Sequence, residues 1–296
     1  MSLIYFLMGS VIIYCLLFWL VPKGNLIHEG LRLPIYQYHA QTTPKNNMIV
    51  KKHRFGNHRR QYFLHCQPKN GATKKQVIIY YHGGGWSLGS PEMFRVNAQF
   101  FVNQGYEVFM PSYRRIPFYR YPAIREDLST TLQQIVKMKQ AEGDNDLKII
   151  LGGMSAGGNL VALMLYDKIA LKKLGLTPNL FSGILLCGAP LDLSQMQKSP
   201  VLWSYAGHKD SDTFRQASPI EHLVGDEQTP ILCIHGKKDG LVFYPSAANF
   251  IAKIKKQNPH LLQSIILPEG THLDTGSWNF HDNELRRQLI AWLKTL

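Results

Sequence analysis

Residues 147–165 read Leu-Lys-Ile-Ile-Leu-Gly-Gly-Met-Ser-Ala-Gly-Gly-Asn-Leu-Val-Ala-Leu-Met-Leu. The apolar run at 149–151 predicts a buried strand, and 159–165 predicts a buried helix. Between them stands Gly153-Met-Ser155-Ala-Gly157, a G-x-S-x-G pattern at a strand-to-helix turn. Glycines let the strand and helix approach closely, and the helix N-terminus turns backbone N–H groups toward the serine. Ser155 is therefore a candidate nucleophile, although the pattern alone also fits a glycine-rich turn with an idle serine.

A second glycine-rich stretch stands upstream, at the end of another predicted strand. The apolar run at 77–81 is followed by His-Gly-Gly-Gly-Trp at 82–86. Successive glycines expose backbone N–H groups without side chains over them, as a site for a developing oxyanion requires. An HGGG stretch that precedes G-x-S-x-G is the arrangement of lipases and esterases. We therefore expect the N–H groups of Gly83, Gly84 and Ala156 to form an oxyanion hole.

With these two motifs, the chain from about residue 77 onward resembles the α/β-hydrolase-fold carboxylesterases related to hormone-sensitive lipase. Ser-Tyr-Arg at 112–114 and Arg-Tyr-Pro-Ala-Ile-Arg-Glu-Asp at 120–127 resemble the "YR…YPA…ED" segment of that family. The resemblance implies an α/β-hydrolase fold with a mostly parallel central sheet flanked by helices and a small cap region, and the sequence itself predicts an additional N-terminal apolar helix. Two departures bear on acyl and alcohol preference. Met154 stands where many relatives have an acidic residue or His, and 115–119 lacks the usual acidic residue after proline.

Apolar runs and turn residues predict the remaining elements. Strands are expected at 105–112, 183–189, 229–235 and 262–267, a hairpin at 48–55 and 61–67, and helices at 125–139 and 245–256. Residues 193–225 are less regular, and we interpret them as a candidate cap or substrate wall, with a surface helix and loops as the alternative. Glu126 and Asp127 are expected to serve helix initiation and packing.

The remaining candidates are an aspartate and a histidine on loops after late strands. Asp239 follows the strand at 229–235 and is the preferred acid, with Asp192 as runner-up because it also follows a strand. His272 follows the last strand behind a glycine and is the preferred base. The alternative, His281, is expected to begin the C-terminal helix. Ser155, Asp239 and His272 then stand in the Ser…Asp…His order of this fold.

Two other histidines, His82 and His235, are expected to make structural hydrogen bonds near the site. The predicted substrate-contacting residues are Trp86, Tyr113 and Met154.

The 296 residues carry a formal net charge of +13, which is unevenly placed. Residues 21–75 contain eleven Lys and Arg residues and one acid, Glu29, and so contribute +10 of this charge (11 − 1). Such a segment favours an anionic lipid or polymer neighbour, although a basic face without specific partner fits equally. No nucleic-acid-binding module is recognisable.

The four cysteines show no paired spacing, so we expect neither a disulfide framework nor a zinc site.

Residues 3–21 contain no charged side chain and have about the length of a membrane-spanning helix. The flanks do not resemble a cleavable signal peptide. We therefore expect a membrane-anchor helix at 1–22, with a buried N-terminal helix as the alternative, and a catalytic domain at 23–296. The side of the membrane and the oligomeric state stay open.

The resemblance implies a serine carboxylesterase that hydrolyses short to medium acyl esters of small molecules through an acyl-enzyme, without a metal or organic cofactor. Two alternatives remain at this stage. One is an amidase, arylformamidase or deacetylase that uses the same triad, and the other is a catalytically dead, anchored binding protein.

Overall fold

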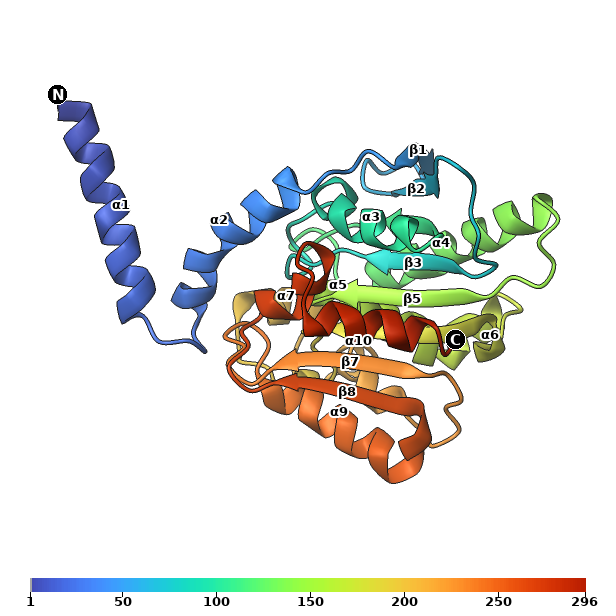
Figure 1. Ribbon diagram of the computed structural model, residues 1–296. Helices are drawn as coiled ribbons and strands as arrows, with labels where there is room; N and C mark the ends of the chain where they lie inside the picture. The colour runs from blue at the N-terminus through green and yellow to red at the C-terminus, as the bar shows by residue number, and fades with distance from the viewer. Residues whose placement is uncertain (1) are drawn as a thin grey trace.

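The computed structural model describes residues 2–296, and at its centre is a sheet of eight strands (Figure 1). Across the sheet the order is β1-β2-β4-β3-β5-β6-β7-β8. The strands are β1 (Met48–Arg54), β2 (Tyr62–Pro68), β3 (Val77–Tyr81), β4 (Glu107–Pro111), β5 (Ile149–Met154), β6 (Phe181–Cys187), β7 (Ile231–Gly236) and β8 (Leu262–Leu267). The pairs β1–β2 and β2–β4 are antiparallel and the other pairs are parallel. This mostly parallel sheet confirms the predicted α/β-hydrolase fold.

The sheet is buried on both faces, which explains the continuous apolar runs of its central strands. Every residue of β3, β5 and β7 is buried, as parallel strands covered by helices on both sides require. At the edge, β1 shows a mixed burial pattern instead.

Helices form a layer on each face of the sheet (Figure 1). Leu132 of α4, Leu160 of α5 and Phe250 of α9 belong to one apolar core. Phe101 of α3 and Leu289 of α10 belong to the other. The helices are α3 (Arg95–Asn103), α4 (Tyr121–Ala141), α5 (Ala156–Tyr166), α6 (Lys168–Lys173), α9 (Tyr244–Gln257) and α10 (Glu284–Leu293).

The predicted element boundaries agree with the structure to within a few residues. The expected hairpin at 48–55 and 61–67 is confirmed as the antiparallel pair β1–β2. The helix expected from residue 125 begins at Tyr121, because Pro122 fits the first helical turn, where its missing N–H costs no hydrogen bond. The expectation that His281 begins the last helix is wrong, since α10 begins at Glu284 after an Asn283 cap.

The irregular segment 193–225 contains the short helices α7 (Pro200–Ala206) and α8 (Asp212–Gln216) and two single 3₁₀ turns. Ser199 and Ser211 cap α7 and α8 by accepting hydrogen bonds from backbone N–H groups, each at 3.2 Å. These caps mark both helix starts in the sequence.

Two helices precede the sheet, α1 (Ser2–Leu20) and α2 (Leu26–Thr42). Figure 1 shows α1 standing apart from the sheet, whereas α2 runs toward it. Within residues 2–296, no helix combines the length and the apolar character that crossing a membrane demands. The membrane anchor and membrane-associated localisation expected from 1–22 therefore gain no support, and Met1 lies outside the described residues.

A buried ionic cluster joins the antiparallel edge of the sheet to α4. Glu107 of β4 accepts a 2.7 Å hydrogen bond from Lys139 Nζ, a 3.0 Å bond from Gln67 Nε2 and a short contact from His65 Nε2. Burial by itself raises the pKa of Glu107, but the bonds from His65 and Lys139 outweigh burial and lower it to about 2. The folded protein therefore stabilises the ionised form of Glu107 relative to the protonated form.

This cluster makes stability depend on pH. Because the folded pKa of Glu107 lies below the ordinary value of 4.5, its contribution is present above pH 4.5 and is lost as pH falls toward 2. We expect Glu107→Gln to lower the free energy of unfolding by about 3 kcal/mol at pH 7. The difference should shrink below pH 4.5 in urea titrations. The exposed Glu284→Gln is the control, and an equal loss at pH 7 and pH 3 for Glu107→Gln would contradict this account.

Candidate active site

The serine of the G-x-S-x-G pattern occupies the sharp turn between β5 and α5. Ser155 has φ 55° and ψ −126°, a backbone conformation that L-residues rarely adopt. Its N–H donates a 2.8 Å hydrogen bond to the carbonyl of Cys187, the last residue of the neighbouring strand β6. Ser155 is half-buried, between a buried strand and a buried helix. The sheet therefore fixes this serine at the carboxyl end of its central strands.

Gly153 and Gly157 make this turn possible, because backbone atoms of neighbouring residues occupy the space that a side chain at either position would need. A Cβ on Gly153 would lie 2.4 Å from the carbonyl carbon of Gly157. A Cβ on Gly157 would lie 2.1 Å from the carbonyl oxygen of Tyr81, at the end of β3. Any larger residue at either position would push α5 away from β5 and β3.

The HGGG loop lies directly against the serine turn. A Cβ on Gly83 would lie 3.2 Å from Ser155 Cβ and 3.0 Å from the Met154 carbonyl oxygen. Gly84 has φ 121°, in a region that favours glycine. Ala156 is the first residue of α5, so its N–H lacks an acceptor within the helix. Of the three positions predicted for the oxyanion hole, Gly83 and Ala156 thus border Ser155, and Gly84 follows Gly83 in the same loop.

Asp239 and His272 lie on loops after neighbouring strands and contact each other. His272 Nδ1 is 2.8 Å from Asp239 Oδ2, and both side chains are buried. The other oxygen of Asp239 accepts hydrogen bonds from the backbone N–H groups of Leu241 (2.9 Å) and Val242 (2.7 Å). The carboxylate is therefore oriented by its own loop, with one oxygen left to face the imidazole.

The end of β6 relates this pair to the serine. The Cys187 carbonyl accepts the hydrogen bond from Ser155 N. A Cβ on the next residue, Gly188, would lie 3.2 Å from His272 Cε1. Burial lowers the pKa of His272, but the charge of Asp239 and its hydrogen bond outweigh burial, so the pKa lies above the ordinary 6.5. The imidazolium is stabilised, as a general base that accepts a proton requires.

The runner-up residues lie elsewhere. Asp192 caps the turn that follows it by accepting a 2.9 Å bond from Ser194 N, and it also accepts a 2.8 Å bond from Asn249 Nδ2. The ring of His281 lies 4.9 Å from that of His39 of α2. Within residues 2–296, neither side chain forms a hydrogen bond, ion pair or ring contact with His272.

The two neighbouring histidines make backbone contacts. His82 Nδ1 lies 2.7 Å from the Gly83 carbonyl, and His235 Nε2 lies 2.9 Å from the Val242 carbonyl. Burial lowers the pKa of His82 to about 3. His82 is therefore neutral near pH 7 and holds the start of the HGGG loop.

The predicted substrate-contacting side chains are buried. Trp86 stacks on Tyr205 of α7 with ring centroids 4.0 Å apart, and Tyr113 stacks on His82 at 4.7 Å. Met154 Sδ lies 3.8 Å from the Tyr36 hydroxyl of α2, on the other side of the sheet from Trp86. In this structure these three side chains are each at most 3% exposed and so present little surface to a ligand.

Sequence reasoning missed the contribution of α2. Glu29, the lone acid of the basic segment, is buried and accepts hydrogen bonds from the backbone N–H groups of Gly240 (3.1 Å) and His272 (2.8 Å). Arg32, one turn later, forms a two-pronged ion pair with Asp274 at 2.6 and 2.7 Å. A single acid among eleven basic residues was the signal that could have found this contact.

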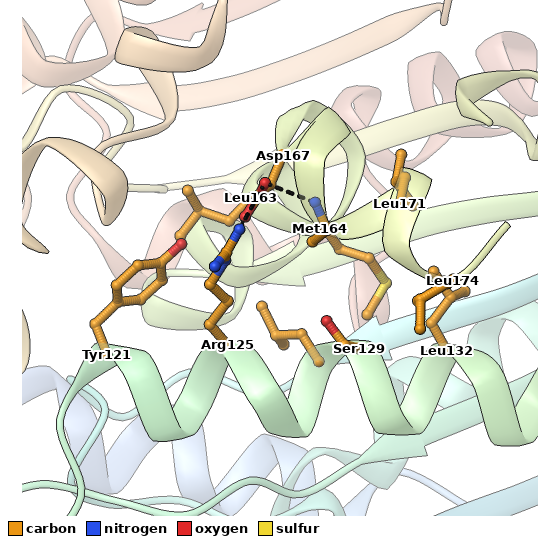
Figure 2. A pocket seen from close by; sticks show the side chains of 11 residues that line it. Tyr121, Arg125, Ser129, Leu132, Leu163, Met164, Asp167, Leu171 and Leu174 are labelled. Atoms are coloured by element: carbon orange, nitrogen blue, oxygen red, sulfur yellow. Dashed lines mark hydrogen bonds and ion pairs between the residues drawn. The ribbon is translucent and has the colours of Figure 1, made fainter. Parts of the chain in front are cut away.

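Two small pockets lie beside helices α4 and α2. Figure 2 shows one between α4 and the end of α5, where Arg125 reaches Asp167 at 2.9 Å. Its residue Leu163 is eight positions beyond Ser155, roughly 12 Å along the helix. The other pocket lies between α2 and the 3₁₀ segment Leu273–Asn279, beside Tyr36 and Phe280.

Among residues 2–296, no group of three His, Cys, Asp or Glu side chains is placed to hold a metal ion.

The sheet order, the strained serine turn and the glycine loop define an α/β-hydrolase of the carboxylesterase type. The BD-FAE family model matches residues 65–254, and the chain belongs to this family. The carboxylesterase NlhH of Mycobacterium tuberculosis is 36% identical over 92 residues, which cover 30% of this chain and 28% of NlhH. Human arylacetamide deacetylase-like 4 is 27% identical over 158 residues, which cover 51% of this chain and 38% of the relative. Each match thus spans less than half of the curated relative.

Among solved structures, esterase B from Lactobacillus rhamnosis superposes with a TM-score of 0.72 at 17% identity, covering 90% of both chains. At this identity the likeness concerns the fold.

The Asp239–His272 contact predicts a titration that NMR can follow. In the wild-type protein, the imidazole signals of His272 should titrate above pH 6.5, because Asp239 stabilises the charged form. Asp239→Asn should lower the pKa, since burial then acts with less opposition. Asp192→Asn is the matched control and should leave it unchanged. If the pKa of His272 fell in Asp192→Asn but stayed unchanged in Asp239→Asn, Asp239 would not be the partner that stabilises the imidazolium.

Proposed function

We propose that this protein is a serine carboxylesterase that hydrolyses short to medium acyl esters through an acyl-enzyme intermediate. The observation that carries the proposal is the convergence of the Ser155 turn, the glycine loop and the buried Asp239–His272 pair at the carboxyl ends of neighbouring strands. Membership of the BD-FAE family and the partial similarity to carboxylesterases support the same reaction class.

In the first half of the reaction, Ser155 Oγ attacks the ester carbonyl carbon while His272 Nε2 takes the hydroxyl proton. Asp239 accepts a hydrogen bond from Nδ1–H and stabilises the imidazolium, without taking the proton itself. The tetrahedral intermediate collapses as its bond to the alcohol oxygen breaks. His272 then gives its proton to the departing alcohol, which leaves the acyl group on Ser155.

In the second half, water attacks the acyl-enzyme carbonyl and His272 takes a proton from it. The second tetrahedral intermediate collapses as the bond between the acyl carbon and Ser155 Oγ breaks, which releases the carboxylic acid, and His272 gives its proton to Ser155 Oγ. The N–H groups of Gly83, Gly84 and Ala156 donate to the oxyanion in both intermediates, and each such donor contributes roughly 3 kcal/mol to the transition state.

We also propose that residues 193–225 form a cap over the glycine loop within a catalytic domain at 23–296. The stack of Tyr205 on Trp86 supports this role, and so does Val201, whose Cγ1 would lie 3.7 Å from a Cβ on Gly85. Trp203, exposed on the same short helix, receives the guanidinium of Arg120 over its ring at 4.5 Å. The cap then limits the acyl chain that fits beside Ser155.

A second candidate function is hydrolysis of an acetylated amine on the same triad. The similarity to human arylacetamide deacetylase-like 4 over 51% of this chain favours it. Attack on an amide follows the same path, except that His272 must protonate a nitrogen leaving group. The two functions therefore differ in leaving group and share every residue named above.

The test is hydrolysis of p-nitrophenyl esters from acetate to palmitate by the full chain, with Ser155→Ala measured beside it. We expect activity that peaks at short chains and falls by about 10³-fold or more in Ser155→Ala. A fluorophosphonate probe should label the wild type and not the variant. The control is Ser129→Ala, which changes a serine that lines the pocket of Figure 2.

Three other results would redirect the proposal. Activity on arylacetamides that exceeds activity on the matched esters would favour the deacetylase. Activity confined to palmitate would point to a lipase. Absence of both hydrolysis and probe labelling would favour a binding protein on a hydrolase scaffold.

A further inference from the structure

The first turns of α2 insert a carboxylate between the two loops that carry the proposed acid and base. Glu29 is only 2% exposed, although it belongs to the most basic segment of the chain. It lies 211 positions before Gly240 and 243 positions before His272. The contact therefore joins α2 to two loops of the C-terminal third.

Both hydrogen bonds converge on one oxygen. Glu29 Oε1 accepts from Gly240 N at 3.1 Å and from His272 N at 2.8 Å. Gly240 follows Asp239 directly, so this oxygen holds the residue after the acid and the backbone of the base at once. The relative position of the two loops is thus coupled through a single acceptor atom.

The surrounding contacts hold α2 in place. A Cβ on Gly240 would lie 2.6 Å from the backbone of Asn25, the residue that caps α2, so the loop and the helix start are in close contact. Arg32 forms its ion pair with Asp274, whose Oδ2 also accepts a 2.8 Å bond from Thr271 N. The helix is therefore fixed on both sides of His272.

Glu29 also acts on His272 through charge. Its carboxylate adds to Asp239 in raising the pKa of the imidazole, against the effect of burial. His235, 3.6 Å from Asp239 Oδ2, and the Arg32–Asp274 pair also face this region. The second oxygen of Glu29, Oε2, is buried and has no hydrogen-bond partner among the described residues, so the charge is weakly screened.

We propose that Glu29 is a positioning residue of the triad. From α2, its carboxylate sets the distance between the loop that carries Asp239 and the loop that carries His272. This inference rests on the proposed function and adds a residue outside the triad and the oxyanion hole. It makes α2 a part of the active site and assigns a role to the lone acid of the segment at 21–75.

Two variants of the full chain separate geometry from charge. Glu29→Gln retains an oxygen that can accept both backbone hydrogen bonds but removes the charge. Glu29→Ala removes both. The readouts are kcat, KM and the pH profile of kcat/KM for p-nitrophenyl acetate, with Tm measured for each variant.

For Glu29→Gln, we expect kcat at high pH within a few-fold of wild type and an acid limb of kcat/KM that moves to lower pH. For Glu29→Ala, we expect kcat to fall by about tenfold to about 100-fold at every pH, because a displacement of about 1 Å in a catalytic loop costs that much. KM should change less than kcat, since Glu29 does not face the ester.

The matched control is His28→Ala, one residue earlier on α2. His28 is also buried, but its ring nitrogen contacts the Val21 carbonyl at 3.1 Å and its ring lies 5.6 Å from that of Phe18 of α1. This variant should lower Tm and leave kcat and the pH profile unchanged.

The inference is overturned if folded Glu29→Gln keeps the wild-type pH profile, or if folded Glu29→Ala retains wild-type kcat. Equal losses of kcat in His28→Ala and Glu29→Ala would also overturn it, because a loosened helix would then suffice. If Glu29→Ala does not fold, Glu29→Gln decides alone. A wild-type protein without Ser155-dependent hydrolysis would instead contradict the proposed function.

Discussion

The close approach of α5 to the strands beneath it is the constraint on which the rest of the site depends. Gly153 and Gly157 leave no room for a Cβ between helix and sheet, and so the chain must reverse within one residue at Ser155. Because β5 is hydrogen-bonded to β3 on one side and to β6 on the other, β5 cannot shift to relieve the strained turn at Ser155. The strain is thus held by the most buried part of the molecule.

The same sheet order brings the other parts of the site together. The glycine loop follows β3, the strand beside β5, and Cys187 ends β6 on the other side. The loops with Asp239 and His272 follow β7 and β8, which continue the parallel sheet. Parallel strands end at one edge, so five strand ends supply the site without any long excursion of the chain.

Much of this arrangement could be predicted from the sequence because the signals are local. An apolar run that ends in glycine identifies a buried strand and its turn, and the chain order then selects the aspartate and the histidine. The serine turn, the glycine loop and the Asp239–His272 contact were all expected on these grounds. Their chemical roles stay a prediction until activity is measured.

Other features depend on partners that are remote in the chain, and local patterns do not contain them. Helix α2 includes Pro34, which obscures a helical pattern, and the partners of Glu29 are more than 200 positions away. The aromatic side chains of Trp86 and Tyr113 were expected to face a ligand, yet each stacks on a ring of its own chain. Net charge likewise concealed that Arg32 is paired with Asp274.

The bonds from α2 to the last third of the chain have a consequence for biosynthesis. The ribosome synthesises α2 early, but Gly240 and His272 emerge only after most of the polypeptide has been translated. Throughout elongation the Glu29 carboxylate therefore lacks both of its backbone partners. The bonds from α2 to these two loops therefore form late, and the nascent chain acquires its assembled loops near the end of synthesis.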